Sequence, residues 1–261
     1  MGFRDRGIEI KTREQIIAMR AAGLVVGRAL ELLRDQVRPG ISTGELDKIA
    51  EDHIRSSGAV PSFKGYQGFT GSICASVTEE IVHGIPGGRV LAEGDLISID
   101  CGAIVDGWHG DAAITVGVGE ADPALLELAR VCEEAMWRGF AAARLGGRLT
   151  DISAAVEQHV RSQADYGIVT DFVGHGIGSA MHQPPNVPNY GKPGRGPKLV
   201  EGLALAVEPM LTLGRQDNHT LADDWTVVTD DGKPAAHTEH TFTLTPAGPW
   251  ILTALDGGES R

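Results

Sequence analysis

The 261-residue chain carries a formal net charge of −12 at pH 7, with 42% hydrophobic and 22% charged residues. These values predict a globular protein with a large core in one or two domains, and the acidic balance argues against specific nucleic-acid binding, which needs a basic surface. Three cysteines without CxxC spacing, no run of about 18 apolar residues and no signal-peptide pattern predict a cytoplasmic protein that enters no membrane.

The first part of the chain predicts two helices followed by a region of strands and turns. A T-x-x-Q capping box opens a helix over residues 12–37, which a Pro-Gly pair stops, and an S-x-x-E box opens a second helix over residues 42–58. Residues 61–90 interleave glycine with aromatic residues, and the β-branched segment 73–77 within them predicts a strand.

Residues 97–116 predict a β-hairpin around which the rest of the chain is organised. Asp106-Gly107 suits a two-residue type I′ turn, because both central residues of that turn need positive φ. The resulting register makes one face of the hairpin wholly apolar. On the other face Asp100 and Asp111 become diagonal neighbours, with Cα atoms roughly 7–8 Å apart.

Two carboxylates placed in this way repel each other unless something positive lies between them. A pair of divalent cations about 3.5–4 Å apart, bridged by one carboxylate, fits the spacing. The alternative is a pair of solvated strand aspartates. The apolar opposite face favours a buried sheet and therefore a metal site, but the hairpin alone leaves both interpretations open.

The remaining elements repeat the order of helices followed by strands. Asp122-Pro123 begins a helix that runs to about Arg144, and Thr150 or Asp151 caps another helix that continues through Val160. The recurrence predicts an α+β architecture of two similar halves, with helices on one side of a curved antiparallel sheet. Residues 184–198, rich in proline and glycine, predict a surface loop.

Three later stretches place a histidine or glutamate in apolar, extended surroundings. Glycines flank His175, so that its ring can lie close to other backbone, although a lone histidine is more often a satisfied core residue. Glu208 follows an apolar run and precedes Pro209, which biases it to extended geometry. Glu239 lies in a strand of alternating polarity.

Together with the hairpin, these stretches supply four carboxylates and one imidazole. Oxygen-rich ligation with one nitrogen suits Mn²⁺, Fe²⁺, Co²⁺ or Zn²⁺ in a two-metal hydrolytic site. Such a site generates a hydroxide near neutral pH and polarises a scissile carbonyl, and no GxSxG motif supplies a serine nucleophile. The predicted ligands are Asp100, Asp111, His175, Glu208 and Glu239.

The ordered set of motifs HGIP, IDCGAIVDGWHGDAAIT, GHGIG, EPM and EHT resembles the type I methionine aminopeptidases over nearly all of residues 12–253. The resemblance implies the pita-bread fold, in which two pseudo-symmetric halves with helices outside a curved, largely antiparallel sheet surround a dinuclear centre. It implies one catalytic metallopeptidase domain over residues 1–261, with an N-terminal arm at 1–11 and a flexible tail at 254–261. The chain is similar to the short form of these enzymes, without an N-terminal extension.

The implied activity is removal of the initiator methionine from peptides and nascent proteins whose second residue is small. In this family a metal-bridging hydroxide attacks the scissile carbonyl. The resemblance further implies two divalent ions (Co²⁺, Mn²⁺, Fe²⁺ or Zn²⁺), a monomer, and a transient contact with the ribosome. Asp111 and Glu239 would bridge the ions, Asp100 would complete the shell of one, and His175 with Glu208 would complete that of the other.

The resemblance also assigns residues that act on the substrate. His83 is similar to the histidine near the new amine, His182 to the histidine that binds the substrate carbonyl and stabilises the oxyanion, and Glu208 to the general base. Aromatic residues beside glycine-rich turns are otherwise usually core. The methionine pocket would be lined by Phe63, Tyr66, Phe69, Cys74, Met181 and Trp225.

Three pocket positions depart from the common family pattern while keeping the pocket apolar. Phe63 stands where a cysteine is common, Phe69 where a tyrosine is common, and Met181 where a phenylalanine is common. Two alternatives share the fold. A prolidase or aminopeptidase P usually carries an additional N-terminal domain, and a non-catalytic peptide-binding module tends to lose metal ligands.

Overall fold

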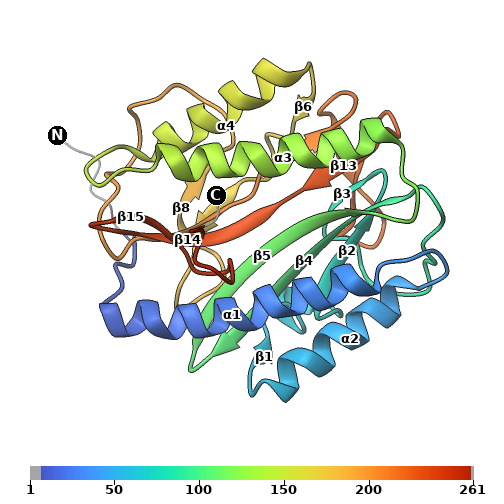
Figure 1. Cartoon of the computed structure of the whole chain (residues 1–261), viewed down its shortest axis with the longest axis horizontal. Helices are drawn as coiled ribbons and strands as arrows, with labels where there is room; N and C mark the ends of the chain where they lie inside the picture. Colours follow the sequence, from blue (N-terminus) through green and yellow to red (C-terminus); the bar gives the residue numbers. More distant parts are fainter. Residues whose placement is uncertain (1–6, 260–261) are drawn as a thin grey trace.

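The computed structural model describes residues 7–259 (Figure 1). No helix in that range is both long and apolar enough to cross a membrane. The principal helices are α1 (Arg13–Gln36), α2 (Thr43–Ser56), α3 (Pro123–Ala142) and α4 (Leu149–Gln163), with a short 3-10 turn, η1 (Tyr66–Gly68).

One large sheet of nine strands forms the centre of the molecule, in the order β1-β4-β5-β14-β9-β7-β8, with β2 also paired to β4 and β15 to β14. Its strands are β1 (Val60–Pro61), β2 (Ile73–Val77), β4 (Leu96–Val105), β5 (Trp108–Gly117), β7 (Gly174–Gly176), β8 (Gln183–Val187), β9 (Ala204–Val207), β14 (Glu239–Thr245) and β15 (Gly248–Ile251). Two three-stranded sheets flank it, β13-β10-β6 and β11-β12-β3. Their strands are β3 (Glu80–Val82), β6 (Gly167–Ile168), β10 (Met210–Thr212), β11 (Asn218–Thr220), β12 (Val227–Thr229) and β13 (Ala235–His237).

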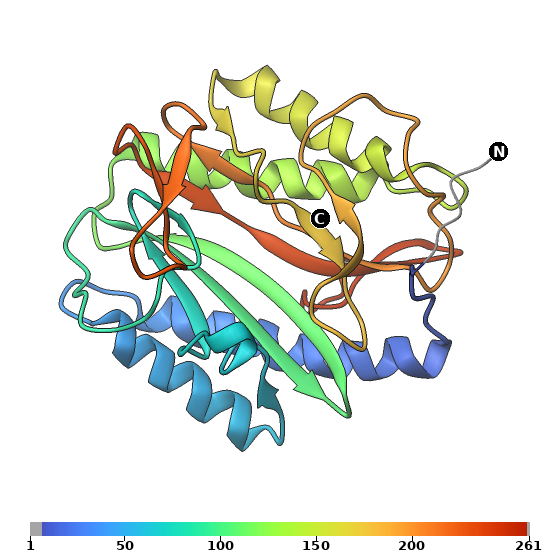
Figure 2. The same ribbon diagram turned by 180° about the vertical axis from the view of Figure 1, so that it is seen from behind.

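The helices lie on one face of the large sheet, and the view from behind looks onto its other face (Figures 1 and 2). One buried cluster joins α1 and α2 to β2, β4 and β5, and a second joins α3 and α4 to β9 and β14. Each pair of helices therefore buries the apolar face of its own part of the sheet. The predicted α+β architecture, with helices outside an antiparallel sheet, is confirmed.

The central hairpin has the predicted register. Val105 pairs with Trp108 across the turn, and Ile99 pairs with Ile114 further along the strands. Asp106 and Gly107 have φ of 50° and 80°, as a type I′ turn requires. A slip of one residue would exchange the apolar and acidic faces, so this register is the feature that places the aspartates.

The predicted loop 184–198 and the predicted start of the fourth helix are each wrong in part. Within the predicted loop 184–198, residues up to Val187 belong to β8, which pairs with β7. Strand β8 lies at the edge of the sheet, where proline is tolerated because no further strand needs its missing N–H. The fourth helix is capped at Arg148 rather than at Thr150 or Asp151, and the Asp151 carboxylate accepts a hydrogen bond from the Arg148 N–H at 2.8 Å.

The predicted tail, residues 254–261, is a folded segment as far as the structure describes it. The Arg20 guanidinium of α1 donates to the carbonyl oxygens of Leu252 at 2.7 Å and Leu255 at 2.9 Å. These hydrogen bonds connect the last turns to α1, and contacts of this kind keep a chain terminus ordered. Residues 260–261, like residues 1–6 of the predicted N-terminal arm, lie outside the described residues.

Helix α1 approaches the sheet closely because glycines meet at the contact. A Cβ on Gly110 of β5 would lie 2.7 Å from the backbone nitrogen of Gly23, and a Cβ on Gly23 would lie 2.1 Å from the carbonyl oxygen of Leu252. Both obstructing atoms are backbone atoms, which cannot move aside without shifting an element. Helix α1 therefore packs directly against β5, the strand that carries Asp111.

We expect Gly23→Ala to lower the free energy of unfolding by about 1–3 kcal/mol or more, because the added methyl group overpacks a backbone contact. Urea denaturation of metal-free protein measures this change without a contribution from bound ligand. Gly88→Ala is the matched control, since a Cβ there meets no atom within 4 Å. Equal midpoints for the two variants would contradict the close approach.

Candidate metal centre

Five neighbouring strands bring the predicted ligands to the face of the sheet opposite the helices. Asp100 comes from β4, Asp111 from β5, Glu239 from β14 and His175 from β7, while Glu208 directly follows β9. These strands are adjacent in the order β4-β5-β14-β9-β7. Because alternate residues of a strand point to opposite faces, the carboxylates face away from the apolar cluster that packs under α1 and α2.

The register explains why three of the carboxylates converge. Asp100 and Glu239 both pair with Ala113 of β5, so they lie on either side of it in one row across the sheet. Asp111 lies two residues before Ala113 and therefore on the same face. The methyl group of Ala113 leaves the space between the longer side chains open.

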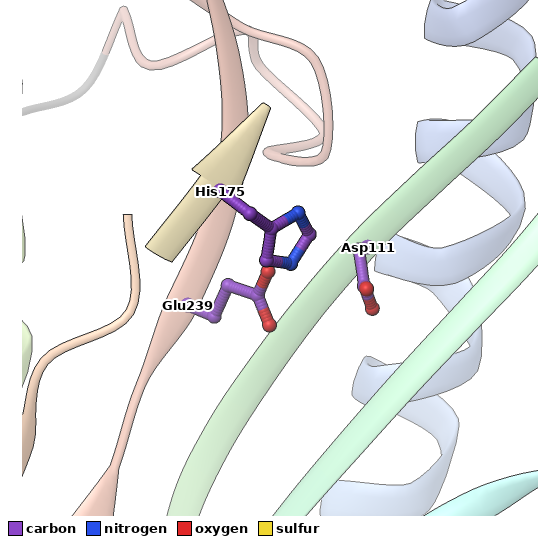
Figure 3. A group of neighbouring side chains, drawn as sticks. All are labelled: Asp111, His175 and Glu239. Carbon is purple, nitrogen blue, oxygen red and sulfur yellow. The ribbon is translucent and has the colours of Figure 1, made fainter. Parts of the chain in front are cut away.

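Figure 3 shows the side chains of Asp111, His175 and Glu239 lying near one another, each from a different strand. Their ligand atoms all lie within 4.8 Å of one another. The Nε2 atom of His175 is 3.4 Å from Oε1 of Glu208, which joins the fourth carboxylate to the group. The sequence-predicted set thus lies at one place, with Asp111, His175, Glu208 and Glu239 all buried.

The glycines beside His175 permit this placement. A Cβ on Gly174 would lie 2.3 Å from the carbonyl oxygen of Ala206, and one on Gly176 would lie 2.2 Å from that of Pro184. The His175 Nδ1 is 3.0 Å from the carbonyl oxygen of Gly176. A carbonyl only accepts hydrogen bonds, so the proton is on Nδ1 and the Nε2 lone pair is free for a metal ion.

The pKa values of the carboxyl groups are raised at this site, so their ionisation is disfavoured. Burial raises the pKa of Asp100 to about 7. Burial and then the charges of Glu239 and Asp100 raise the pKa of Asp111, and burial with the charges of Asp100 and Asp111 does the same for Glu208. Burial lowers the pKa of His175 to about 3, so this imidazole is neutral.

The residues present fit divalent cations. Buried carboxylate oxygens of Asp100 (Oδ1), Asp111 (Oδ1) and Glu239 (Oε1) have no hydrogen-bond partner among residues 7–259, and a buried unpaired acceptor is costly. Cations between these oxygens would supply the missing partners and offset the repulsion. The donor set of carboxylate oxygens and one imidazole nitrogen suits borderline divalent transition metals.

The predicted substrate residues line the same cavity, which has a volume of about 490 Å³. Phe63, Phe69, Cys74 and Met181 form a buried apolar cluster, and Tyr66 and Trp225 pack against it half-buried. The predicted site residues that line this one cavity are Phe63, Tyr66, Phe69, Cys74, His83, Asp100, Asp111, His175, Met181, His182, Glu208, Trp225 and Glu239.

Two histidines, His83 and His182, line the same cavity beside the apolar cluster. The His182 ring lies 4.3 Å from that of His175, centroid to centroid, and its Nδ1 is 3.0 Å from the Tyr66 hydroxyl. His83, held at a φ of 62°, lies edge-on to Trp225 at 6.0 Å. Burial lowers the pKa of both, that of His83 to about 4, so both rings are neutral near pH 7.

One neighbour of the centre was missed by the sequence analysis. His237 is 1% exposed, and its Nε2 lies 3.7 Å from Oε2 of Glu208, on the other side of that carboxylate from His175. Its position two residues before Glu239, on the same face of an extended segment, was a signal that could have revealed it. Ligand atoms of His237, Glu208 and Glu239 all lie within 4.8 Å of one another, so His237 is a further residue that could hold a metal ion.

The comparisons with known proteins agree with this geometry. The sequence model of "Metallopeptidase family M24" matches residues 17–246. Methionine aminopeptidase of Clostridium acetobutylicum is 51% identical over 95% of this chain and 100% of its own length. Methionine aminopeptidase 1 of Mycobacterium tuberculosis is 52% identical over 95% of this chain and 96% of its own.

Solved structures show the same relationship. The crystal structure of methionine aminopeptidase from Thermotoga maritima is 40% identical and superposes with a TM-score of 0.93, covering 95% of this chain and 99% of that one. Prolidase from Pyrococcus furiosus has a TM-score of 0.76 at 22% identity, covering 94% of this chain and 65% of its own. That second likeness shows the shared fold alone.

The chain belongs to metallopeptidase family M24, and the predicted pita-bread fold is confirmed. Within that family it belongs with the bacterial type I methionine aminopeptidases. It is a metal-dependent aminopeptidase, which sets aside the alternative of a non-catalytic binding module.

We expect Asp111→Ala and Glu239→Ala each to lose most of the bound divalent metal, since each removes a carboxylate from the middle of the ligand group. Elemental analysis of desalted protein after metal loading measures the stoichiometry. Asp52→Asn on the exposed face of α2 is the control for loss of one negative charge. Unchanged metal content in either variant would contradict a bridging role for that residue.

Proposed function

We propose that the protein removes the N-terminal methionine from peptides and nascent proteins whose second residue is small, with two divalent ions held by Asp100, Asp111, His175, Glu208 and Glu239. The observation that carries the proposal is that an apolar pocket and the metal ligands line a single cavity. A side chain bound in the pocket would therefore bring its own amine and carbonyl to the ligands.

The pocket suits an unbranched thioether side chain. Its walls are aromatic and sulfur-containing, with Phe69 and Trp225 edge to face at 5.0 Å and with Cys74 and Met181 beside them. Thioether sulfur makes favourable contacts with aromatic rings, and a flexible methionine fits irregular apolar space. Burial and then the charge of Asp100 raise the pKa of the Cys74 thiol, so this wall is uncharged.

When bound, the cations would supply a hydroxide near neutral pH and polarise the scissile carbonyl. Side chains of the protein would accept the proton of the attacking water and bind the substrate's amine. Glu208, between the imidazoles of His175 and His237, accepts the proton of the attacking water. His83, whose ring is neutral, faces the substrate's amine.

His182 stabilises the oxyanion that forms from the carbonyl. Its ring is neutral because burial lowers its pKa. The Tyr66 hydroxyl lies 3.0 Å from Nδ1, and in the tautomer whose Nδ1 accepts from this hydroxyl the ring hydrogen is on Nε2. Nε2–H is then a donor set in place before the charge develops, and this is the arrangement that lowers a barrier most effectively.

We further propose that the enzyme is cytoplasmic and acts as a monomer. Its free cysteines, Cys74, Cys101 and Cys132, are all buried and unpaired within the described residues, which is compatible with a reducing compartment. A transient contact with the ribosome would bring nascent chains to the cavity.

We expect hydrolysis of Met-Ala peptides to exceed that of Leu-Ala and Pro-Ala peptides, to stop after removal of metal by excess chelator, and to return when divalent ions are restored. Peptide cleavage followed by chromatography measures each step. Full activity of demonstrably metal-free protein would sink the proposal, and equal rates on the three peptides would refute the pocket assignment.

We expect His182→Ala to lower kcat by roughly 10²–10³ because it removes an oxyanion donor, while metal content stays at the level of the unmodified protein. Steady-state kinetics with elemental analysis of the same sample tests both points. If the variant loses metal, the histidine is a ligand and its assigned role is wrong.

A further inference from the structure

The segment that joins β7 to β8 carries two cavity residues, Met181 and His182. It turns tightly, with the Gly178 N–H donating to the Ala180 carbonyl oxygen at 3.1 Å. Ser179 and Ala180 are exposed at its tip. A short exposed connection of this kind needs other contacts if it is to keep His182 fixed.

Those contacts come from the N-terminal arm. One carboxylate oxygen of Glu9, Oε2, accepts hydrogen bonds from the Ser179 N–H at 3.1 Å and the Gln183 side-chain amide at 2.9 Å. The other, Oε1, accepts one from the Ser179 hydroxyl at 2.8 Å. One acidic side chain thus binds both ends of the turn on either side of His182.

Lys11 completes the connection from inside. Its side chain is 1% exposed, and its Nζ lies 3.5 Å from Oε2 of Glu9. The same ammonium donates to the Glu9 carbonyl oxygen at 3.0 Å and to Oε1 of Gln183 at 3.3 Å. Gly178 leaves room for it, since a Cβ there would lie 2.3 Å from Cε of Lys11.

The arm is itself anchored beside the ligand-bearing strands. Ile10 forms an antiparallel bridge with Leu203, and the Lys11 N–H donates to the Gly202 carbonyl oxygen at 2.8 Å. From Ala204 the chain continues as β9 toward Glu208. A continuous series of contacts therefore runs from β9, next to Glu208, through residues 9–11 to the turn.

We propose that Glu9 and Lys11 are positioning residues that hold the turn 178–183, and through it His182, in place over the metal centre. The proposal rests on the function proposed above only for the consequence at His182. These contacts of Glu9 and Lys11 with Ser179 and Gln183, called the tether below, can be tested without a substrate.

The first test follows the turn directly, by amide hydrogen exchange in metal-loaded protein. Glu9→Gln removes the charged acceptor of the Ser179 N–H and leaves the buried ammonium of Lys11 without its carboxylate partner. We expect exchange of the Ser179 amide to rise about tenfold, the order expected for loss of a hydrogen bond to a charged group. Asp52→Asn, which breaks an exposed pair with Lys48, should leave that exchange unchanged.

The second test asks whether the tether acts through His182. We expect Glu9→Gln to lower kcat on a Met-Ala peptide by about tenfold, since a small displacement of a catalytic group is costly, and to leave metal content unchanged. In the His182→Ala background the same change should have less than about twofold effect, because the group being positioned is absent. A loss of equal size in both backgrounds overturns the proposal.

Ser179→Ala serves if Glu9→Gln does not fold, because it removes the hydroxyl donor alone and should raise exchange of residues 178–183 in the same direction. Unchanged exchange in the folded variant overturns the tether. If exchange rises but the unmodified protein cleaves no Met-Ala peptide, the proposed function fails while the tether stands.

Discussion

Repulsion among four buried carboxyl groups is the constraint on which this structure depends. Burial raises the pKa of Asp100, Asp111, Glu208 and Glu239. Neighbouring carboxylate charges raise the pKa of the last three further. Removing charged groups from water costs several kcal/mol each unless they are paired. Cations held between the unpartnered oxygens of Asp100, Asp111 and Glu239 would offset this cost.

The two faces of β4 and β5 differ in chemistry: one packs against the helices and the other carries the acidic residues. On the side of the helices, apolar residues of β4 and β5 and the close contact of Gly23 with Gly110 hold the hairpin rigidly. On the other side the same strands present acids that would move apart if the backbone could yield. Rigidity supplied by the apolar face is therefore what keeps the acidic face in a geometry suited to binding ions and substrate.

Several cavity residues lie in the connections between strands. Met181 and His182 lie in one turn, and Tyr66, whose hydroxyl is 3.0 Å from Nδ1 of His182, lies in another. Turns are mobile unless something fastens them. Here the fastening of the first turn is supplied by Glu9 and Lys11 of the N-terminal arm, far from it in sequence.

The sequence by itself determined the helices with capping boxes and the register of the hairpin, and it supplied the residues predicted as metal ligands. These follow from local rules: Asp106-Gly107 selects its turn, and alternation assigns Asp100 and Asp111 to one face. Only the tertiary structure decided that β8 is an edge strand despite its prolines, that Arg20 binds the final turns, and that Glu9 and Lys11 contact the turn that carries His182. Those features are contacts between segments distant in sequence, and no local pattern encodes which distant partner a side chain will meet.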